Sequence, residues 1–285
     1  MSLNNSISFE GRNLVIATKH GKENVIAPII EKEIGVSCIV PDNFDTDELG
    51  TFTGEIEREL DQIATARKKC HLAMDLTGAD LAISSEGSFG PHPSLYFVHS
   101  DDELLMLIDK KNNLELFVRF MTVETNFNGR EITHTKQLFE FANLVKFPSH
   151  GLIIKKAKHD LSAIEKGILD WKKLSLTANL FLEKYGSFYV ETDMRAMYNP
   201  SRMNFIEKVT EKLITKIKST CPECMWPGFS ISEIIEGLPC DLCTRPTNSP
   251  LKYKYICQKC SFSNEVKFPN QVTSENPMYC NFCNP

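Results

Sequence analysis

Four Cys-x-x-Cys pairs lie in the last sixty-five residues, and they constrain the fold more than any other feature of the sequence. They contain eight of the ten cysteines: Cys221, Cys224, Cys240, Cys243, Cys257, Cys260, Cys280 and Cys283. A two-residue gap lets both thiolates of one tight turn bind the same metal ion. Two such pairs complete the tetrahedral Cys₄ shell that is typical of structural zinc. The sequence therefore predicts two zinc sites.

The spacing does not determine how the four pairs combine. We expect sequential pairing, which gives two zinc ribbons with connecting loops of ordinary length. In that arrangement Cys221 and Cys224 join Cys240 and Cys243, and Cys257 and Cys260 join Cys280 and Cys283. Interleaved and nested pairings remain alternatives. Disulfides are the main alternative chemistry, but no signal peptide precedes the chain, so we expect reduced thiols and a cytoplasmic protein.

The charge of the cysteine-rich segment bears on nucleic-acid binding. From Cys221 onward there are five cations and six anions. They are Arg245, Lys252, Lys254, Lys259 and Lys267, and Glu223, Glu233, Glu236, Asp241, Glu265 and Glu275. The whole chain carries a net charge of -5. A surface that binds phosphates should be basic, so this balance favours a structural role, with nucleic-acid binding as the alternative.

The first part of the chain has the pattern of an α/β domain. A short apolar strand over 14–17 runs into a helix that Gly35 ends, and a second strand follows over 37–40. This order suggests two parallel strands with a right-handed crossover. A long helix with one apolar stripe spans 56–74, and a third strand spans 80–84. No apolar run approaches the roughly 18 residues that a membrane span requires.

Later segments extend this domain and link it to the cysteines. We expect strands over 95–99, 104–109, 114–124 and 152–154, and a helix over 135–146. A capping box, Ser162-Ala163-Ile164-Glu165, predicts a helix to about Leu174, and a further helix spans 204–218. The expected architecture is an α/β domain with a mixed, largely parallel sheet and flanking helices over 11–154. A helical connector over 155–220 and a double zinc-ribbon-like module over 221–285 complete it.

The turn after the first strand is a candidate phosphate site. Thr18, Lys19 and Lys22 lie between a strand and a helix N-terminus. Backbone N–H groups, a hydroxyl and two ammonium groups there suit a phosphate. The alternative is a solvated strand-to-helix turn, because the segment lacks the glycines of a P-loop.

Acidic residues and a histidine are the other candidates for chemistry. Asp42, Asp45, Asp47, Glu55, Asp80 and Glu86 follow predicted strand ends or begin a helix. Carboxylates of this kind hold Mg²⁺ beside a substrate phosphate, although a solvated acidic loop is the simpler interpretation of the three early aspartates. We favour a functional role for Glu86, because Ser85–Pro93 has the composition of a strand-end loop. His92, between two prolines, is either a general acid or base, a phosphate partner, or an ordinary loop histidine.

Three of these segments together resemble the inosine/xanthosine triphosphate pyrophosphatases over roughly residues 11–150. The matching segments are Ala17-Thr18-Lys19-His20-Gly21-Lys22, Gly54-Glu55 with Arg58, and Ala79–Gly87. His20 stands where that family has Asn, and Ser88 replaces its second Gly. The resemblance implies that Lys22 binds phosphate and that Glu55, Asp80 and Glu86 bind magnesium.

The whole chain also resembles an uncharacterised family of bacterial proteins defined only as a domain of unknown function. The segments that carry this likeness are Glu86–Pro93, Glu191–Arg195 with Asn199-Pro200, and the eight-cysteine tail. We predict a magnesium-dependent hydrolase of a nucleotide or related phosphorylated small molecule. Glu86, His92 and Lys22 would be catalytic, and Thr18, Lys19, Glu55 and Asp80 would bind phosphate and metal. A non-catalytic adaptor whose zinc module binds protein or nucleic acid is the alternative.

Overall fold

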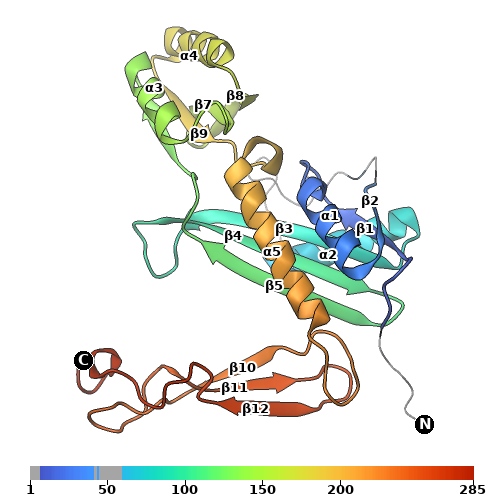
Figure 1. Cartoon of the computed structure of the whole chain (residues 1–285). Helices are drawn as coiled ribbons and strands as arrows, with labels where there is room; N and C mark the ends of the chain where they lie inside the picture. The colour runs from blue at the N-terminus through green and yellow to red at the C-terminus, as the bar shows by residue number, and fades with distance from the viewer. Residues whose placement is uncertain (1–6, 42–43, 45–59) are drawn as a thin grey trace. The chain divides into compact units, whose positions relative to one another are not determined.

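The computed structural model describes residues 7–41, 44 and 60–285, and the chain forms two compact units. One unit spans Phe9–Ile214, and the other contains the C-terminal segment Thr215–Pro285. Helix α5 (Pro200–Lys218) carries the chain from one unit into the other (Figure 1). Within the described ranges, no helix is long and apolar enough to span a membrane.

The first unit contains a mixed five-stranded sheet in the order β2-β1-β3-β4-β5. Its strands are β1 (Asn13–Ala17), β2 (Ser37–Ile39), β3 (Leu81–Pro91), β4 (His99–Asp109) and β5 (Leu114–Thr122). β1 pairs in parallel with both β2 and β3, which confirms the predicted parallel pair at the start of the chain. β3, β4 and β5 pair antiparallel, so the sheet is half parallel rather than largely parallel.

Strand β3 differs most from expectation. The segment 85–91 was expected to be a loop, but it continues the strand and pairs with β4 as far as Pro91 and His99. The predicted strand over 95–99 is instead the connection into β4. The ladder to β4 stabilises extended backbone despite Gly87 and Gly90, because each paired residue adds hydrogen bonds and cross-strand contacts.

Two helices illustrate how local sequence forms this unit. α1 (Glu23–Ile34) ends at Gly35, whose φ of 72° is the left-handed conformation that glycine adopts without steric cost. α2 (Gln62–Thr77) begins at Asp61, whose carboxylate accepts the N–H of Ala64. Cys70 of α2 lies in the core with the apolar face of the sheet, as its place in the predicted stripe indicated. Residues 56–59 of the predicted helix lie outside the described ranges.

A four-stranded antiparallel sheet in the order β6-β9-β7-β8 forms a separate part of the same unit, with a core of its own (Figure 1). Its strands are β6 (Gly129–Ile132), β7 (Leu152–Ala157), β8 (Asp160–Ile168) and β9 (Phe188–Thr192). Helices α3 (Thr135–Leu144) and α4 (Trp171–Tyr185) share its core, around Phe141 and Phe188. The predicted helical connector over 155–220 is therefore wrong. The capping box at Ser162 lies in β8, because pairing with β7 outweighs the local helix signal.

The C-terminal unit is built on a three-stranded antiparallel sheet. Its strands are β10 (Ile231–Glu236), β11 (Pro250–Ile256) and β12 (Ser263–Lys267). A short 3₁₀ helix, η3 (Pro277–Tyr279), precedes the last cysteine pair, and another, η2 (Ala196–Tyr198), precedes α5 in the first unit. So small a sheet has little core of its own, which makes the cysteine groups beside it important for stability.

Candidate metal centres and a buried polar site

The eight tail cysteines form two groups of four. Cys221, Cys224, Cys257 and Cys260 make one group, and Cys240, Cys243, Cys280 and Cys283 make the other. Within each group the sulfur atoms lie within 4.8 Å of one another, and none is in a disulfide. The first pair thus joins the third, and the second joins the fourth. Sequential pairing is wrong, and the interleaved alternative is the one the structure shows.

The sulfur separations suit zinc. The Sγ atoms of Cys221 and Cys260 are 3.7 Å apart, and those of Cys243 and Cys280 are 3.6 Å apart. A tetrahedron with Zn–S bonds of about 2.3 Å has edges of about 3.8 Å. Both groups are therefore compatible with a zinc ion at the centre.

The same turn presents the first three cysteine pairs. In each, the residue after the second cysteine donates its backbone N–H to the carbonyl of the first cysteine, from Met225, Thr244 and Ser261. All three residues have φ close to 60°. This left-handed conformation turns the backbone away from the sulfur atoms, so that both thiolates of the pair point to one side. Asn284 donates in the same way to Cys280 in the fourth pair.

A second candidate site lies where β1 ends. Ala17, the last residue of β1, pairs with Ser84, so Ser85 and Glu86 of β3 continue just beyond the end of β1. The following turn is tight, with φ of 77° at both His20 and Gly21. Lys22, at the N-terminus of α1, is buried, and its Nζ donates to the backbone and side-chain oxygens of Ser85 at 3.3 and 3.2 Å.

Burial, and then the charge of the neighbouring Arg202, lowers the pKa of Lys22 to about 8. Removing an ammonium group from water disfavours its charged form, and a second cation nearby does the same. Most copies of Lys22 are still charged at neutral pH. Because the ammonium of Lys22 donates these two hydrogen bonds to one neutral residue, Ser85, an anion binding here would offset part of the cost of burying its charge.

Arg202 and Glu103 form the centre of the polar site. Both side chains are fully buried, with Nε of Arg202 2.6 Å from Oε1 of Glu103. Burial, and then the charge of Glu103, raises the pKa of Asp101 to about 8, because the two acids lie two positions apart on one face of β4. Asp101 Oδ1 and Glu103 Oε2 are buried without a hydrogen-bond partner among the described residues.

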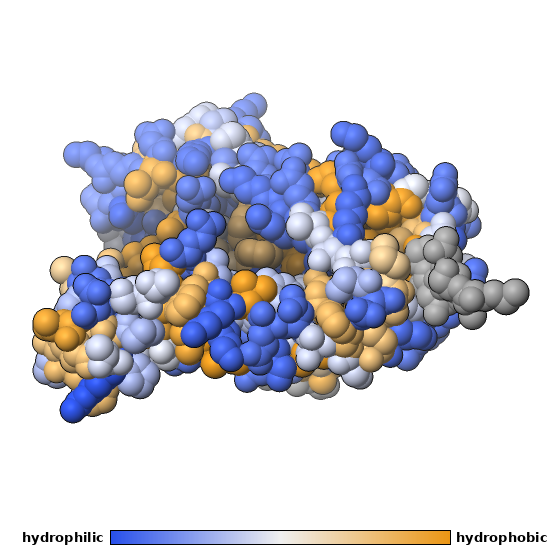
Figure 2. All heavy atoms as spheres, turned by 60° about the horizontal axis from the view of Figure 1, so that its bottom comes forward, coloured by the Kyte–Doolittle hydropathy of each residue, from blue (hydrophilic) through white to orange (hydrophobic). Residues whose placement is uncertain are grey.

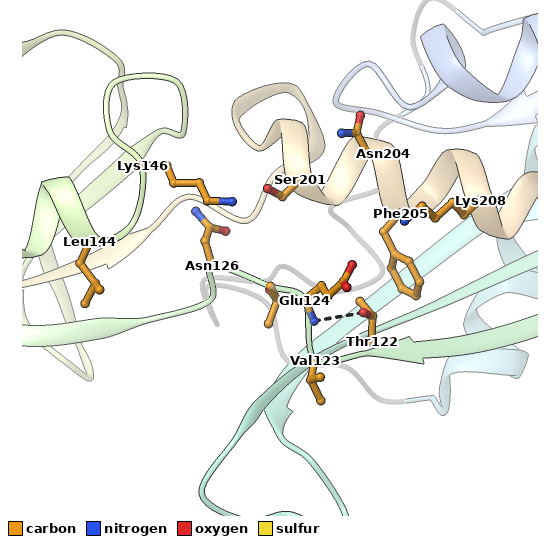
Figure 3. A pocket seen from close by; sticks show the side chains of 11 residues that line it. Thr122, Val123, Glu124, Asn126, Leu144, Lys146, Ser201, Asn204, Phe205 and Lys208 are labelled. Carbon is orange, nitrogen blue, oxygen red and sulfur yellow. Dashed lines mark hydrogen bonds between the residues drawn. The ribbon is translucent and has the colours of Figure 1, made fainter.

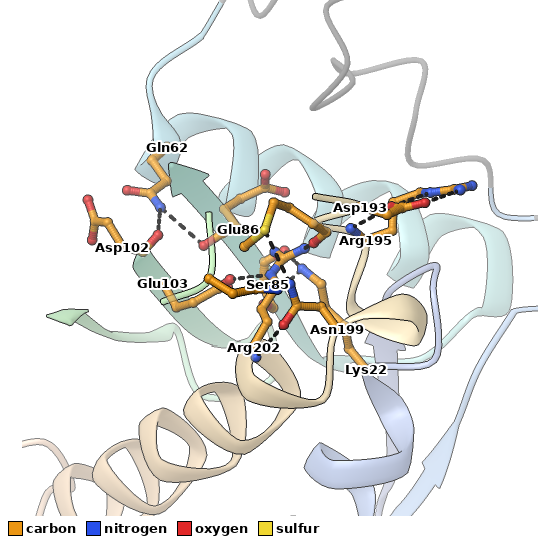
Figure 4. A network of polar contacts seen from close by, with 12 residues as sticks. Lys22, Gln62, Ser85, Glu86, Asp102, Glu103, Asp193, Arg195, Asn199 and Arg202 are labelled. Carbon is orange, nitrogen blue, oxygen red and sulfur yellow. Dashed lines mark hydrogen bonds and ion pairs between the residues drawn. The ribbon is translucent and has the colours of Figure 1, made fainter. Parts of the chain in front are cut away.

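The opposite face of the sheet carries a second ion pair. Side chains alternate along β3, so Glu86 lies on the face opposite to Ser85 and reaches Lys69 of α2 at 2.5 Å. Gln62, at the start of α2, donates to the backbone oxygens of Glu86 and Asp102 at 3.1 Å. Figure 4 shows Lys22, Ser85, Glu86, Glu103 and Arg202 gathered around β3 and the N-terminus of α5.

The structure brings some of the predicted residues together and separates others. Thr18, Lys19 and Lys22 lie together at the end of β1, where Thr18 is buried and donates to the Lys19 carbonyl. Lys22 contacts Ser85, whereas the side chain of Glu86 lies on the opposite face of the sheet, against Lys69. His92 lies six residues beyond Glu86, about 20 Å at strand spacing. Its Nδ1 accepts the N–H groups of Ser94 and Leu95 in the β3–β4 connection.

The acids expected to bind magnesium are not gathered with Glu86. Asp80 precedes the opposite end of β3, where it pairs with Arg12 at 2.9 Å. Glu55 lies outside the described residues, as do Asp42, Asp45 and Asp47. Among the described residues, the two Cys₄ groups alone bring three or more metal-binding side chains together.

Sequence reasoning missed Lys69, Asp101 and Glu103. A signal existed for the last two, because acidic residues directly before the apolar run 104–108 indicate buried charges that require partners. Two ion pairs involve the segment 191–202: Arg195 pairs with Asp193 at 2.6 Å, and Arg202 pairs with Glu103.

Comparison with known families gives one match. The family model described as a domain of unknown function, DUF6671, matches residues 69–285. The match covers most of the chain, including the polar strands β3 and β4 and all eight cysteines, and the chain therefore belongs to this family. No curated protein matches the chain.

Proposed function

We propose that this member of the DUF6671 family binds and hydrolyses a phosphorylated small molecule, of the nucleotide type, at the end of β1. The observation that carries the proposal is the buried ammonium of Lys22, which the turn before α1 holds at a helix N-terminus. A phosphate placed there would meet a buried cation and the positive end of the α1 dipole. The turn itself supplies Thr18 and Lys19.

The neighbouring acids suit proton transfer. Asp101 holds its proton up to a pKa of about 8, so at neutral pH it is a carboxylic acid that can donate a proton to a leaving oxygen. Glu103 stays ionised beside Arg202, which lowers its pKa, and two neighbouring acids with opposite shifts can perform different roles. On the other face of β3, Lys69 neutralises the charge of Glu86 through an ion pair that joins the strand to α2.

A magnesium requirement remains a prediction, and no step is derived through the ion. Mg²⁺ at phosphate sites usually takes one or two carboxylates, waters and substrate oxygens. The described residues place one of the predicted acids, Glu86, at the end of β1, and Lys69 already contacts it at 2.5 Å. Activity measured with and without added Mg²⁺, and after chelation, tests the requirement directly.

Phosphate release from a panel of nucleoside mono-, di- and triphosphates tests the proposal. We expect turnover of at least one class, a loss of at least tenfold in kcat/KM for Lys22→Met, and no change for Lys111→Met. Lys111 is an exposed lysine in the β4–β5 turn and is the matched control. Wild-type protein that turns over no member of the panel, or equal activity in the two lysine variants, would contradict the proposal.

The two cysteine groups complete the proposal as structural zinc sites. Zinc binding would supply the folding free energy that so small a sheet lacks, because binding to the folded state alone stabilises it. The sites are closed, with four cysteines and no position left for a substrate, which favours structure over catalysis. Metal analysis should find two zinc ions per chain.

The adaptor function is a second candidate, and the surface of the C-terminal unit supports it. Exposed apolar side chains lie close to the second cysteine group in sequence, with Leu242 72% and Phe282 57% exposed. Another apolar row crosses the sheet at Ile234, Tyr253 and Val266. Figure 2 shows hydrophobic residues exposed among hydrophilic ones, and exposed apolar residues mark an interaction surface where they form a contiguous patch. Titration with labelled RNA and DNA at two salt concentrations tests the nucleic-acid form of this function, which predicts binding that weakens steeply with salt.

A further inference from the structure

A cavity of about 450 Å³ lies in the first unit, away from Lys22. Its walls come from the end of β5, the segment after it, the residues that follow α3, and the first turns of α5 (Figure 3). α5 contributes Ser201, Asn204, Phe205 and Lys208, which are three, four and seven positions apart and therefore share one face of the helix. Lys146 lines the cavity as well.

Ser201 is hydrogen-bonded to a buried histidine. Its Oγ lies 2.9 Å from Nε2 of His150, and its backbone N–H donates to the same nitrogen at 3.3 Å. A ring nitrogen that accepts an N–H carries no proton of its own, so the one lone pair of Nε2 is directed at Ser201, where the hydroxyl and the backbone N–H share it. The proton is therefore on Nδ1, which lies 2.9 Å from Ser149 Oγ.

This tautomer is the one that a general base requires. Ser149 Oγ can accept the Nδ1 proton, because it donates its own to the Lys146 carbonyl at 2.6 Å. Ser149 thus orients the ring through Nδ1, and the basic nitrogen Nε2 points at the hydroxyl of Ser201. Burial, followed by the charge of Lys146, keeps the pKa of His150 below its usual value, so the ring is neutral at pH 7.

We propose that Ser201 and His150 are a nucleophile and its general base, and that the cavity takes a carboxylic ester with an anionic group. Ser201 Oγ attacks the ester carbonyl carbon while its proton passes to His150 Nε2. The carbon–oxygen bond to the leaving alkoxide then breaks, and the alkoxide takes the proton from Nε2. Water hydrolyses the acyl-serine by the same route, with His150 again as base.

The charges of the cavity select the substrate class. Lys146 and Lys208 contribute two positive charges to the lining and Glu124 one negative charge, which leaves a net positive wall. Asn204, one helical turn from Ser201, presents an amide to the same space and can donate to a developing oxyanion. Leu144, Val123 and Phe205 supply apolar surface for the acyl chain. No local sequence pattern indicates this pair, because Ser201 and His150 are 51 positions apart.

Labelling with an alkyl fluorophosphonate tests the proposal. An activated serine forms an oxygen–phosphorus bond with this probe, fluoride leaves, and the proton goes to the base. We expect one adduct per chain on Ser201 by peptide mass spectrometry, none on Ser201→Ala, and labelling slowed about 100-fold or more by His150→Asn. Ser94→Ala removes an exposed loop serine and should label like the wild type.

The pH dependence of wild-type labelling keeps the test independent of how the histidine variant folds. The rate should rise as His150 loses its proton and should level off below pH 7.

Hydrolysis of p-nitrophenyl acetate and of the p-nitrophenyl half-ester of succinate then tests the substrate class. Lys146→Met should slow hydrolysis of the charged ester more than hydrolysis of the acetate. No adduct on Ser201, or equal labelling with and without His150, overturns the proposal. Lys22→Met should label normally, which separates this site from the phosphate site.

Discussion

The guanidinium of Arg202 meets the carboxylate of Glu103 at 2.6 Å, with both side chains fully buried and 99 positions apart in the sequence. The pair joins the first turn of α5 to strand β4. Arg202 also donates to the backbone oxygen of Met194 and lies over the Phe89 ring, 4.9 Å from its centre. One side chain thus connects the five-stranded sheet to the segment that leads into α5.

Removing one partner of this pair should be costly. Arg202→Met leaves the Glu103 carboxylate buried without its cation, and we expect a loss of about 3–5 kcal/mol in the free energy of unfolding. The double variant Arg202→Met with Glu103→Leu should recover most of that loss, since no buried charge then lacks a partner. Urea denaturation of the three proteins checks this. A double variant less stable than Arg202→Met would contradict it.

A side chain at Gly87 should destabilise the protein, because it would collide with the ion pair between Arg202 and Glu103. A Cβ built at Gly87 would lie 2.5 Å from Glu103 Oε1 and against Arg202, whereas a Cβ at Gly90 meets no atom within 4 Å. We expect Gly87→Ala to destabilise the protein by about 1–3 kcal/mol, as overpacking does, and Gly90→Ala to have little effect. Thermal unfolding of both variants measures the difference, and equal effects would show that the ion pair shifts freely.

The buried acid Asp101 should make stability fall as pH rises. Its pKa is about 8 in the folded protein and about 3.8 in the unfolded chain, so the folded state binds the extra proton between these values. Stability therefore falls with pH across that window and is constant, for this group, above it. Asp101→Asn should remove the dependence. Relative to wild type, the variant should be more stable at pH 8 than at pH 5, as the free energies of unfolding of both proteins at the two pH values will show.

Zinc counts in double variants test the interleaved pairing. Cys221→Ser combined with Cys257→Ser removes two ligands from one group and should leave one zinc per chain. Cys221→Ser combined with Cys240→Ser damages both groups and should leave none. Sequential pairing predicts the reverse order, so metal analysis of the two purified proteins distinguishes the arrangements in a single comparison.

Local sequence predicted the elements whose signals are local. The apolar run 14–17, the helix that Gly35 ends and the parallel pairing of β1 with β2 are all present. The signals failed where distant pairing decided the conformation. Ser85–Pro91 is extended because β4 lies beside it, and the capping box at Ser162 lies in a strand because β7 pairs with it.

The candidate sites show the same division. Cys-x-x-Cys spacing indicated which residues bind metal, but the choice of partner depends on how the strands of the C-terminal unit bring the turns together. Lys22 and Glu86 were accessible to sequence reasoning because both lie near the end of β1. The partners of Glu86 and Glu103 were not, because these ion pairs connect separate elements that no short pattern relates.

Calorimetric binding of inorganic phosphate at pH 7 and pH 9, with wild type and Lys22→Met, tests the central claim most directly. Because the pKa of Lys22 is about 8, its ammonium is mostly charged at pH 7 and mostly neutral at pH 9. Wild-type protein should bind phosphate at pH 7 and lose most of that affinity at pH 9, and Lys22→Met should bind weakly at both. Binding that is equally strong in the variant, or no binding by wild type at pH 7, would show that Lys22 is not a phosphate ligand.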